Sequence, residues 1–183
     1  MKTKLRKKQN SKHLNPKYWN DILKLYDACL NNATDLSEEA DLLYKHGHYA
    51  RAFALAITAY EEIGKSQIVA DLFNDMVSEN EFNDAFKIHE IKSAYNARKF
   101  ILNMKNLDSS HIDYKLKSGK KYNKWRIAAT YVDCFNEYKT QEPKNLISKE
   151  NAKEAIDTVN HEIEEIHKMA YLTERIGSKS FMK

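Results

Sequence analysis

A polar cluster interrupts the most apolar segment of this 183-residue chain. Glu61, Glu62, Gly64 and Lys65 directly follow residues 49–60, which are apolar almost all the way round a helix. Each carboxylate falls on an apolar helical stripe, where an ionised carboxylate is costly unless it is paired. Lys65, four residues after Glu61, is a candidate partner. Spacing alone favours an ion pair at the edge of a core, whereas Gly64 indicates a close contact with another helix or a ligand, because glycine inside a helix costs about 1 kcal/mol relative to alanine.

Two later segments carry the residue types of an acid–base site. His89 continues the stripe of Phe82 and Phe86, and Lys92 lies one turn further along the same side. Arg126 lies among apolar residues in a third segment. Arginine neutralises developing negative charge, and histidine moves protons near neutral pH. A histidine on an aromatic stripe is more often a hydrogen-bonded core residue than a catalyst, so both interpretations stay open at this point.

A basic and aromatic segment is the best candidate for contact with RNA. No acidic residue occurs between Lys115 and Val132. Basic side chains attract phosphates and aromatic rings stack on unpaired bases. The predicted RNA-binding residues are Lys120, Lys121, Tyr122, Lys124 and Trp125. The alternative is a solvated loop beside a helix.

The net charge of +4 is concentrated at the N-terminus. Residues 1–17 contain seven basic residues and no acidic one, which leaves 23 basic and 26 acidic residues in the remainder. A body with a charge of −3 does not present a broad nucleic-acid footprint, so any contact with RNA must be local. We expect residues 1–17 to form a basic disordered tail, residues 18–177 a single helical domain, and residues 178–183 a C-terminal tail.

Helical periodicity predicts an all-α fold, a four- to five-helix, mainly antiparallel bundle. Only four glycines and two prolines are present, too few for a many-turned β protein. Asn15 and Pro16 predict one helix start and Ser148 another, and Gly47 predicts a helix end. The first helix has possible breaks at residues 31–32 and 37–39. The expected helices cover residues 17–46, 48–77, 81–104, 121–130 and about 27 residues after 148, with a loop at 105–120 and an irregular stretch from 131 to 143.

Cysteine usage and hydropathy predict a cytoplasmic protein that does not enter the membrane. Cys29 and Cys134 are far apart and form no CxxC motif, as is typical of reduced thiols. The longest nearly apolar run, residues 52–60, is far shorter than the ~20 residues that span a bilayer. Glu164 and His167 have the spacing of half a di-iron site, but no second Glu-x-x-His occurs in the sequence. We therefore expect no metal and no cofactor.

The polar segments together resemble a known family. Residues 47–65, which end in the Glu-Glu-x-Gly-Lys sequence, closely resemble the corresponding segment of the AbiV family of bacterial abortive-infection proteins, within the HEPN superfamily. The family's later pattern is His-x-x-Lys on the next helix, then an Arg shortly before Tyr-Val-Asp. It is matched by His89 and Lys92, and by Arg126 before residues 131–133.

The resemblance covers roughly residues 28–160. It implies a HEPN-like helical bundle, frequently a homodimer, that acts in anti-phage defence on RNA or translation. Many HEPN proteins are metal-independent endoribonucleases in which an Arg and a His, from an Arg-x4–6-His motif, act on a phosphodiester while the 2′-hydroxyl attacks.

This sequence departs from that motif. Its only Arg-x6-His, Arg6 to His13, lies in the expected tail. Ribonuclease activity therefore requires Arg126 and His89 to meet in space. The catalytic candidates are Glu61, Glu62, Lys65, His89, Lys92 and Arg126. One alternative is a non-catalytic HEPN module that binds a phage or host protein or a nucleotide, and another is a purely structural bundle.

Overall fold

The computed structural model describes residues 15–73, 77–89, 92, 109–135 and 138–173. Along these residues the chain forms a short 3-10 helix, six α-helices and two strands. In chain order they are η1 (Pro16–Tyr18), α1 (Trp19–Lys45), α2 (Tyr49–Phe73), α3 (Glu79–Lys87), α6 (Ser109–Thr130), β1 (Asp133–Phe135), β2 (Lys139–Gln141), α7 (Pro143–Leu146) and α8 (Lys149–Thr173).

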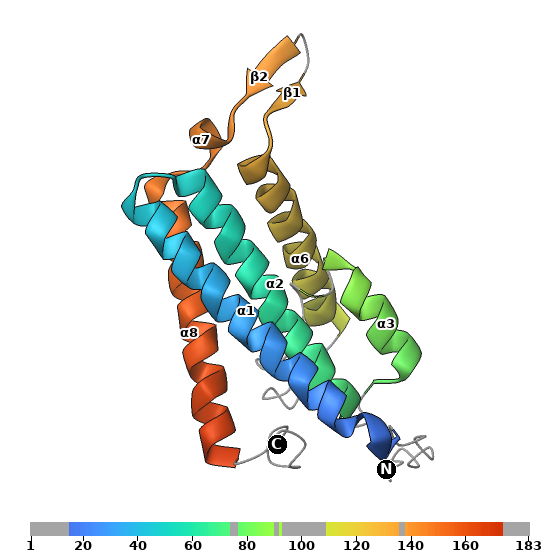
Figure 1. Ribbon diagram of the computed structural model, residues 1–183. Coiled ribbons are helices and arrows are strands. Elements are labelled where there is room, and N and C mark those ends of the chain that lie inside the picture. The colour runs from blue at the N-terminus through green and yellow to red at the C-terminus, as the bar shows by residue number, and fades with distance from the viewer. Residues whose placement is uncertain (1–14, 74–76, 90–91, 93–108, 136–137, 174–183) are drawn as a thin grey trace.

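Four long helices of the described chain pack into a bundle. Helices α1 and α6 run in one direction and α2 and α8 in the other (Figure 1). Helix α2 is central, because it contacts α1, α3, α6 and α8. This arrangement confirms the predicted all-α, mainly antiparallel bundle. Among the described residues, no helix has both the length and the apolar character needed to cross a bilayer.

The ends of the first two helices follow local chemistry. The Asn15 side-chain oxygen accepts a hydrogen bond from the Lys17 backbone N–H at 3.0 Å, and Pro16 begins η1, as predicted. Gly47 has a φ of +79° after the last turn of α1, a conformation that suits glycine. Helix α1 continues unbroken through residues 31–39. The tight turn at Gly47 makes α1 and α2 an antiparallel pair.

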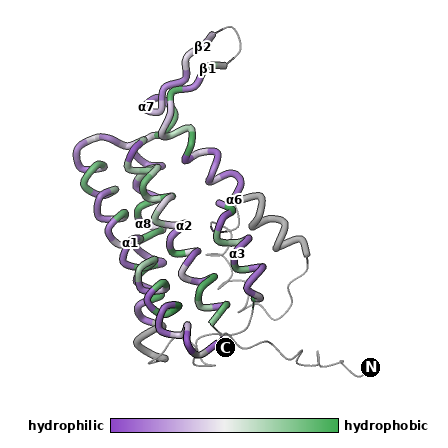
Figure 2. Tube along the Cα trace, turned by 45° about the vertical axis from the view of Figure 1, so that its right-hand side comes forward, coloured by the Kyte–Doolittle hydropathy of each residue, from purple (hydrophilic) through white to green (hydrophobic). Residues whose placement is uncertain are grey.

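Small side chains bring the helices of the core together. Ala33 and Ala40 on α1, and Ala52, Ala56 and Ala59 on α2, are fully buried. Figure 2 shows hydrophobic and hydrophilic residues alternating along α1, as expected for an amphipathic helix with one buried face. In contrast, α2 buries most of its residues, which explains why its sequence is apolar nearly all round.

The predicted third helix, residues 81–104, is wrong in its extent. Helix α3 begins after a capping box in which Ser78 and Glu81 exchange hydrogen bonds, and it ends at Lys87. Ile88 is extended, and the Lys92 backbone N–H then donates to the Ile88 carbonyl at 3.2 Å. The chain thus changes direction before His89, where continuous periodicity predicted one helix. Residues 93–104 lie outside the described residues.

The loop predicted for residues 105–120 is also wrong from residue 109 onward. Helix α6 spans Ser109–Thr130 and continues through Gly119. An internal glycine costs a helix only about 1 kcal/mol, which packing of α6 along α2 offsets. Residues 105–108 lie outside the described residues.

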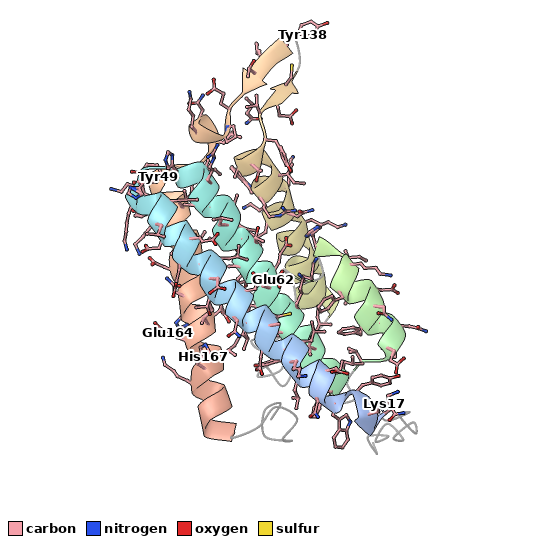
Figure 3. All side chains as sticks on the ribbon, viewed as in Figure 1. Lys17, Tyr49, Glu62, Tyr138, Glu164 and His167 are labelled. Carbon is pink, nitrogen blue, oxygen red and sulfur yellow. The ribbon has the colours of Figure 1, made fainter. Side chains whose placement is uncertain are left out.

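A small hairpin replaces the irregular stretch predicted after α6. Strands β1 and β2 pair antiparallel, with Cys134 opposite Thr140. The hairpin projects beyond the bundle, with Tyr138 at its tip (Figure 3). Helix α8 then begins after Ser148, whose hydroxyl accepts from the Asn151 backbone N–H at 3.1 Å, confirming the predicted cap.

Candidate functional site

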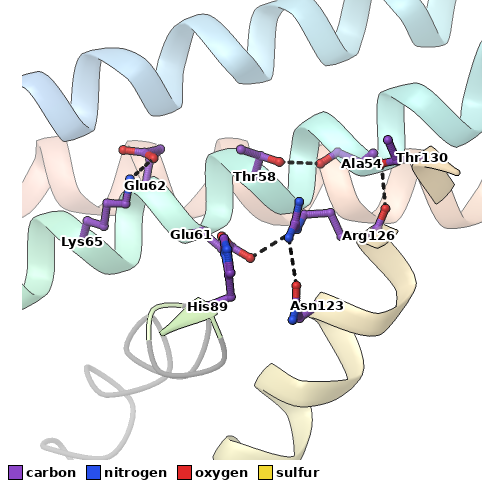
Figure 4. Close-up of polar contacts among 9 residues, drawn as sticks. All are labelled: Ala54, Thr58, Glu61, Glu62, Lys65, His89, Asn123, Arg126 and Thr130. Atoms are coloured by element: carbon purple, nitrogen blue, oxygen red, sulfur yellow. Dashed lines mark hydrogen bonds and ion pairs between the residues drawn. The ribbon is translucent and has the colours of Figure 1, made fainter. Parts of the chain in front are cut away.

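Glu61 is the point at which three segments of the chain meet. It lies on α2 and is only 3% exposed. Its Oε2 is 2.6 Å from Nδ1 of His89, which follows α3, and its Oε1 is 3.5 Å from Nε of Arg126 on α6 (Figure 4). A buried carboxylate requires such partners. His89 and Arg126 are therefore brought together through one shared carboxylate.

The contact between Arg126 and Glu61 is loose. Although Arg126 Nε and Glu61 Oε1 are both buried, they do not form a hydrogen bond. Instead, Arg126 Nη2 donates to the Asn123 side-chain oxygen at 2.9 Å. A guanidinium has five N–H donors in a planar fork. Arg126 is held in place from two sides while it retains donors for an oxyanion.

The contact with Glu61 sets the chemical state of His89. An ionised carboxylate only accepts hydrogen bonds, so beside an ionised Glu61 we assign the proton of the neutral ring to Nδ1. The other ring nitrogen, Nε2, is then the atom that can take up or release a proton. The His89 side chain is 47% exposed, so it is accessible to a ligand. Glu61 orients the ring.

Gly64 allows the segment that carries His89 to approach α2. A Cβ atom at Gly64 would lie 1.9 Å from the Lys92 backbone oxygen and 2.7 Å from its carbonyl carbon. Real Cβ contacts do not occur at such distances, so the backbone at Lys92 rests directly on α2. This confirms the close contact that Gly64 predicted and identifies its partner as the segment after α3.

Lys92 lies buried beside the charged groups of the site, with 5% of its surface exposed. Burial lowers the pKa of its ammonium group below the usual range; the Glu61 carboxylate opposes this shift and the Lys65 cation adds to it. The Glu62 carboxylate also raises this pKa and the Arg126 guanidinium also lowers it, both more weakly. Lys92 therefore contributes positive charge close to both carboxylates from a position with little access to solvent.

Glu62 and Lys65 form a second ion pair beside this cluster. Lys65 Nζ pairs with Glu62 Oε1, and it also lies 5.6 Å from the centre of the Phe86 ring. Lys65 was one candidate partner for Glu61 from its i,i+4 spacing, but it pairs with its i,i+3 neighbour Glu62 instead. Glu62 lies on the other side of α2 from Glu61 (Figure 4). Burial raises the pKa of the Cys29 thiol on α1 to about 11, and the Glu62 carboxylate adds to this shift.

The predicted RNA-binding residues occupy the exposed part of α6. Lys120 and Lys124 are exposed, while Lys121, Tyr122 and Trp125 line a cavity of about 330 Å³. Tyr60 on α2 reaches the same cavity, and its ring centre lies 5.9 Å from that of Tyr122. Arg126 and Asn123 belong to the other side of α6, toward Glu61.

Two residues of this region were missed by sequence reasoning. Asn123 holds Arg126, and its signal was the i,i+3 spacing that places both on one helical face. Tyr60 lines the cavity and directly precedes Glu61 in the chain. A tyrosine at the end of an apolar run has no distinguishing sequence pattern. Glu164 and His167 lie exposed on α8, away from Glu62 (Figure 3).

Comparison with known proteins agrees with this architecture. The chain matches the family model HEPN_AbiV, described as AbiV, over residues 21–164. No curated protein and no solved structure matches the chain. The all-α bundle is thus of the HEPN type. The chain belongs to the AbiV family.

Proposed function

We propose that this chain acts in abortive infection as a metal-independent endoribonuclease. Membership of the AbiV family supports the role in anti-phage defence. The single observation that supports RNA cleavage is the convergence of His89 and Arg126 on Glu61, from segments that are far apart in the sequence. These are the two residue types that the missing Arg-x4–6-His motif would supply. A cytoplasmic location and a homodimer remain predictions.

In the proposed reaction, His89 Nε2 takes the proton of a ribose 2′-hydroxyl. The 2′-oxygen attacks phosphorus, the bond from phosphorus to the 5′-oxygen breaks, and the 5′-oxygen leaves with a proton from solvent. The products are a 2′,3′-cyclic phosphate and a 5′-hydroxyl. Arg126 donates hydrogen bonds to the phosphorane oxygens, where negative charge develops. Glu61 stabilises the imidazolium that forms on His89, as a positioning residue that does not touch the substrate.

Glu62, Lys65 and Lys92 have a supporting role in this proposal. The ion pair of Glu62 with Lys65 is largely shielded from solvent, and Lys92 is buried. They balance charge around Glu61 and hold the segment after α3 against α2.

Incubation of the purified full-length chain with total RNA, with and without EDTA, tests the activity. We expect cleavage that EDTA does not prevent, with 2′,3′-cyclic phosphate ends. His89→Ala should slow it roughly 10²- to 10⁴-fold, the usual contribution of acid–base catalysis. His161→Ala, at an exposed position on α8, is the matched control and should cleave normally. Intact RNA, together with unchanged phage protection by His89→Ala, would rule out the ribonuclease.

A non-catalytic binding module is the second candidate, and the burial of Glu61 favours it. In this alternative the carboxylate, which is 3% exposed, fixes the register of three segments and takes no part in chemistry. In that case RNA stays intact, and a Glu62→Gln, His89→Ala double variant still captures a partner protein stoichiometrically. Loss of both RNA cleavage and protection in His89→Ala, with the fold intact, excludes this alternative.

A further inference from the structure

A cavity lies on the side of α6 opposite the contact between Arg126 and Glu61. Its walls come from α2, α6 and α8, together with Ile147. The buried part is apolar and includes Phe53, Ile57 and Val159, while Tyr122 and Trp125 stand at its exposed side. Its volume of about 330 Å³ falls within the range of about 300–1,000 Å³ for pockets that hold small ligands. The cavity therefore suits a single flat group better than an extended chain.

Polar groups are also present around the cavity. Lys121 lines it on the α6 side. Asn151, Glu154 and Thr158 line it on the α8 side, at i, i+3 and i+7 positions that share one helical face. An aromatic wall beside side chains that donate and accept hydrogen bonds is the arrangement by which proteins hold an unpaired nucleobase.

The outer surface of α6 connects this cavity with His89 and Arg126. Lys120 and Lys124 are exposed and one turn apart, so they lie together on the face of α6 that points away from α2. A helix with its side chains is about 10–12 Å across, which a short stretch of RNA can cross. The two ammonium groups would meet its phosphates on the way.

We propose that the cavity binds one unpaired base of a single-stranded RNA, whose backbone crosses α6 over Lys120 and Lys124 and presents a nearby phosphodiester to Arg126 and His89. This proposal rests on the proposed function, because it assigns a binding site to the same substrate. It makes Trp125 and Tyr122 stacking residues, and it explains why aromatic and basic residues alternate in this part of the sequence.

The lysines of α6 favour RNA over a protein partner, and they outnumber Glu154, the one carboxylate among the described residues that line the cavity. The body of the chain is slightly acidic outside its N-terminal tail, yet Lys120, Lys121 and Lys124 gather beside the cavity. A cavity that received an apolar protein side chain would not need this local positive charge. Phosphates adjacent to a stacked base would be matched by it.

The test measures binding separately from cleavage. A short fluorescent single-stranded RNA that carries 2′-deoxyribose throughout the cleavable region cannot be cut, so anisotropy reports affinity for the full-length chain. Trp125→Leu keeps an apolar side chain but removes the stacking ring. We expect it to weaken binding roughly 5- to 160-fold, the usual range for one stacked base. Trp19→Leu is the matched control, because Trp19 is 47% exposed on α1 against 37% for Trp125.

Two further experiments identify the base that the cavity binds and the route of the RNA backbone over α6. In a series of RNAs that each lack one base, the wild type should bind one member more weakly than the intact RNA. Trp125→Leu should bind that member and the intact RNA equally. The Lys120→Ala, Lys124→Ala double variant should reduce the slope of log affinity against log salt by roughly 1.4, since each phosphate contact on a single strand contributes about 0.7. The Lys24→Ala, Lys149→Ala double variant, at exposed sites on α1 and α8, should leave the slope unchanged.

The outcomes separate this proposal from the proposed function. Lost cleavage in His89→Ala, together with binding of the uncut RNA that still depends on Trp125, supports the cavity whatever the chemistry. Equal RNA affinity for Trp125→Leu and Trp19→Leu overturns the cavity proposal, while the proposed ribonuclease function still stands. Tight binding of a free mononucleotide that is independent of Lys120 and Lys124 would overturn the strand path. Loss of phage protection in Trp125→Leu with normal RNA binding would assign the cavity to a protein contact instead.

Discussion

Glu61 and Glu62 are neighbours in the chain, yet they lie in different chemical environments on two sides of α2 (Figure 4). Glu61 contacts His89 and Arg126, which come from remote segments. Glu62 pairs with Lys65, one turn away on its own helix. A local pair forms wherever a helix forms, whereas a remote set exists only if the whole bundle positions it. The comparison suggests that the Glu61 side carries the function and the Glu62 side supports the fold.

After the loss expected for His89→Ala, replacing Arg126 is expected to have the next largest effect on the Glu61 side. Arg126→Lys keeps the charge but loses the planar fork, and RNA cleavage should fall roughly 10²- to 10³-fold, as on removal of one oxyanion donor. Single-turnover cleavage rates provide the measurement. Arg51→Lys, at an exposed position on α2, is the control. Equal rates for both variants would remove Arg126 from the proposed reaction.

Replacing Gly64 with alanine should disturb the Glu61 side of α2 through the backbone at Lys92. In an ordinary helix, glycine to alanine stabilises by about 1 kcal/mol. Here the new Cβ would lie 1.9 Å from the Lys92 backbone oxygen, so we expect Gly64→Ala to lower the free energy of unfolding by about 1–3 kcal/mol and to displace His89 from Glu61. Urea denaturation and RNA cleavage measure the two effects. A stabilised variant with normal activity would contradict the contact.

The Glu62 side should respond in stability alone. Lys65→Met keeps the aliphatic stem near Phe86 but removes the partner of Glu62, and it should cost about 1 kcal/mol of unfolding free energy. Cleavage should remain within about twofold of the wild type. Lys24→Met, at an exposed position, should change neither quantity. A large loss of activity in Lys65→Met would place Lys65 in the site, as the sequence first suggested.

Lys92 gives the smallest expected effect, and it appears at alkaline pH. Because its pKa is lowered in the folded chain, the unfolded chain binds more protons between that pKa and the ordinary value of 10.5. The contribution of Lys92 to stability therefore rises with pH across this window, by less than the limit of about 1.4 kcal/mol per pH unit for one proton. The unfolding free energy of the wild type minus that of Lys92→Met should therefore increase with pH across this window. Parallel curves would mean that Lys92 is not desolvated.

The sequence was most informative where structure is decided locally. Caps at Asn15 and Ser148 and the stop at Gly47 were predicted because each depends on a few adjacent residues. The bend at Ile88 was missed because nothing near it breaks the helical period. It makes sense only through the contact of Lys92 with Gly64, 28 residues earlier in the chain.

The candidate site divides in the same way. The residue types at positions 61, 89 and 126 identified its members, and the family resemblance put them in order. Their pairing was not accessible, since i,i+4 spacing favoured Lys65 as the partner of Glu61, while the tertiary fold supplies His89 and Arg126 instead. The start of α6 at Ser109 was also not accessible, because Ser118 and Gly119 are typical of a loop.

The most direct measurement compares Glu61→Gln with Glu62→Gln in one RNA-cleavage assay, with the unfolding free energy of each variant as a check on folding. The two substitutions are chemically identical and adjacent, so they differ only in the side of α2 that they alter. We predict that Glu61→Gln loses at least about 100-fold in cleavage rate, because His89 loses the charge that stabilises its imidazolium. We predict that Glu62→Gln stays close to the wild type. Equal losses in both variants, or a greater loss in Glu62→Gln, would contradict the division of α2 into a functional and a supporting side.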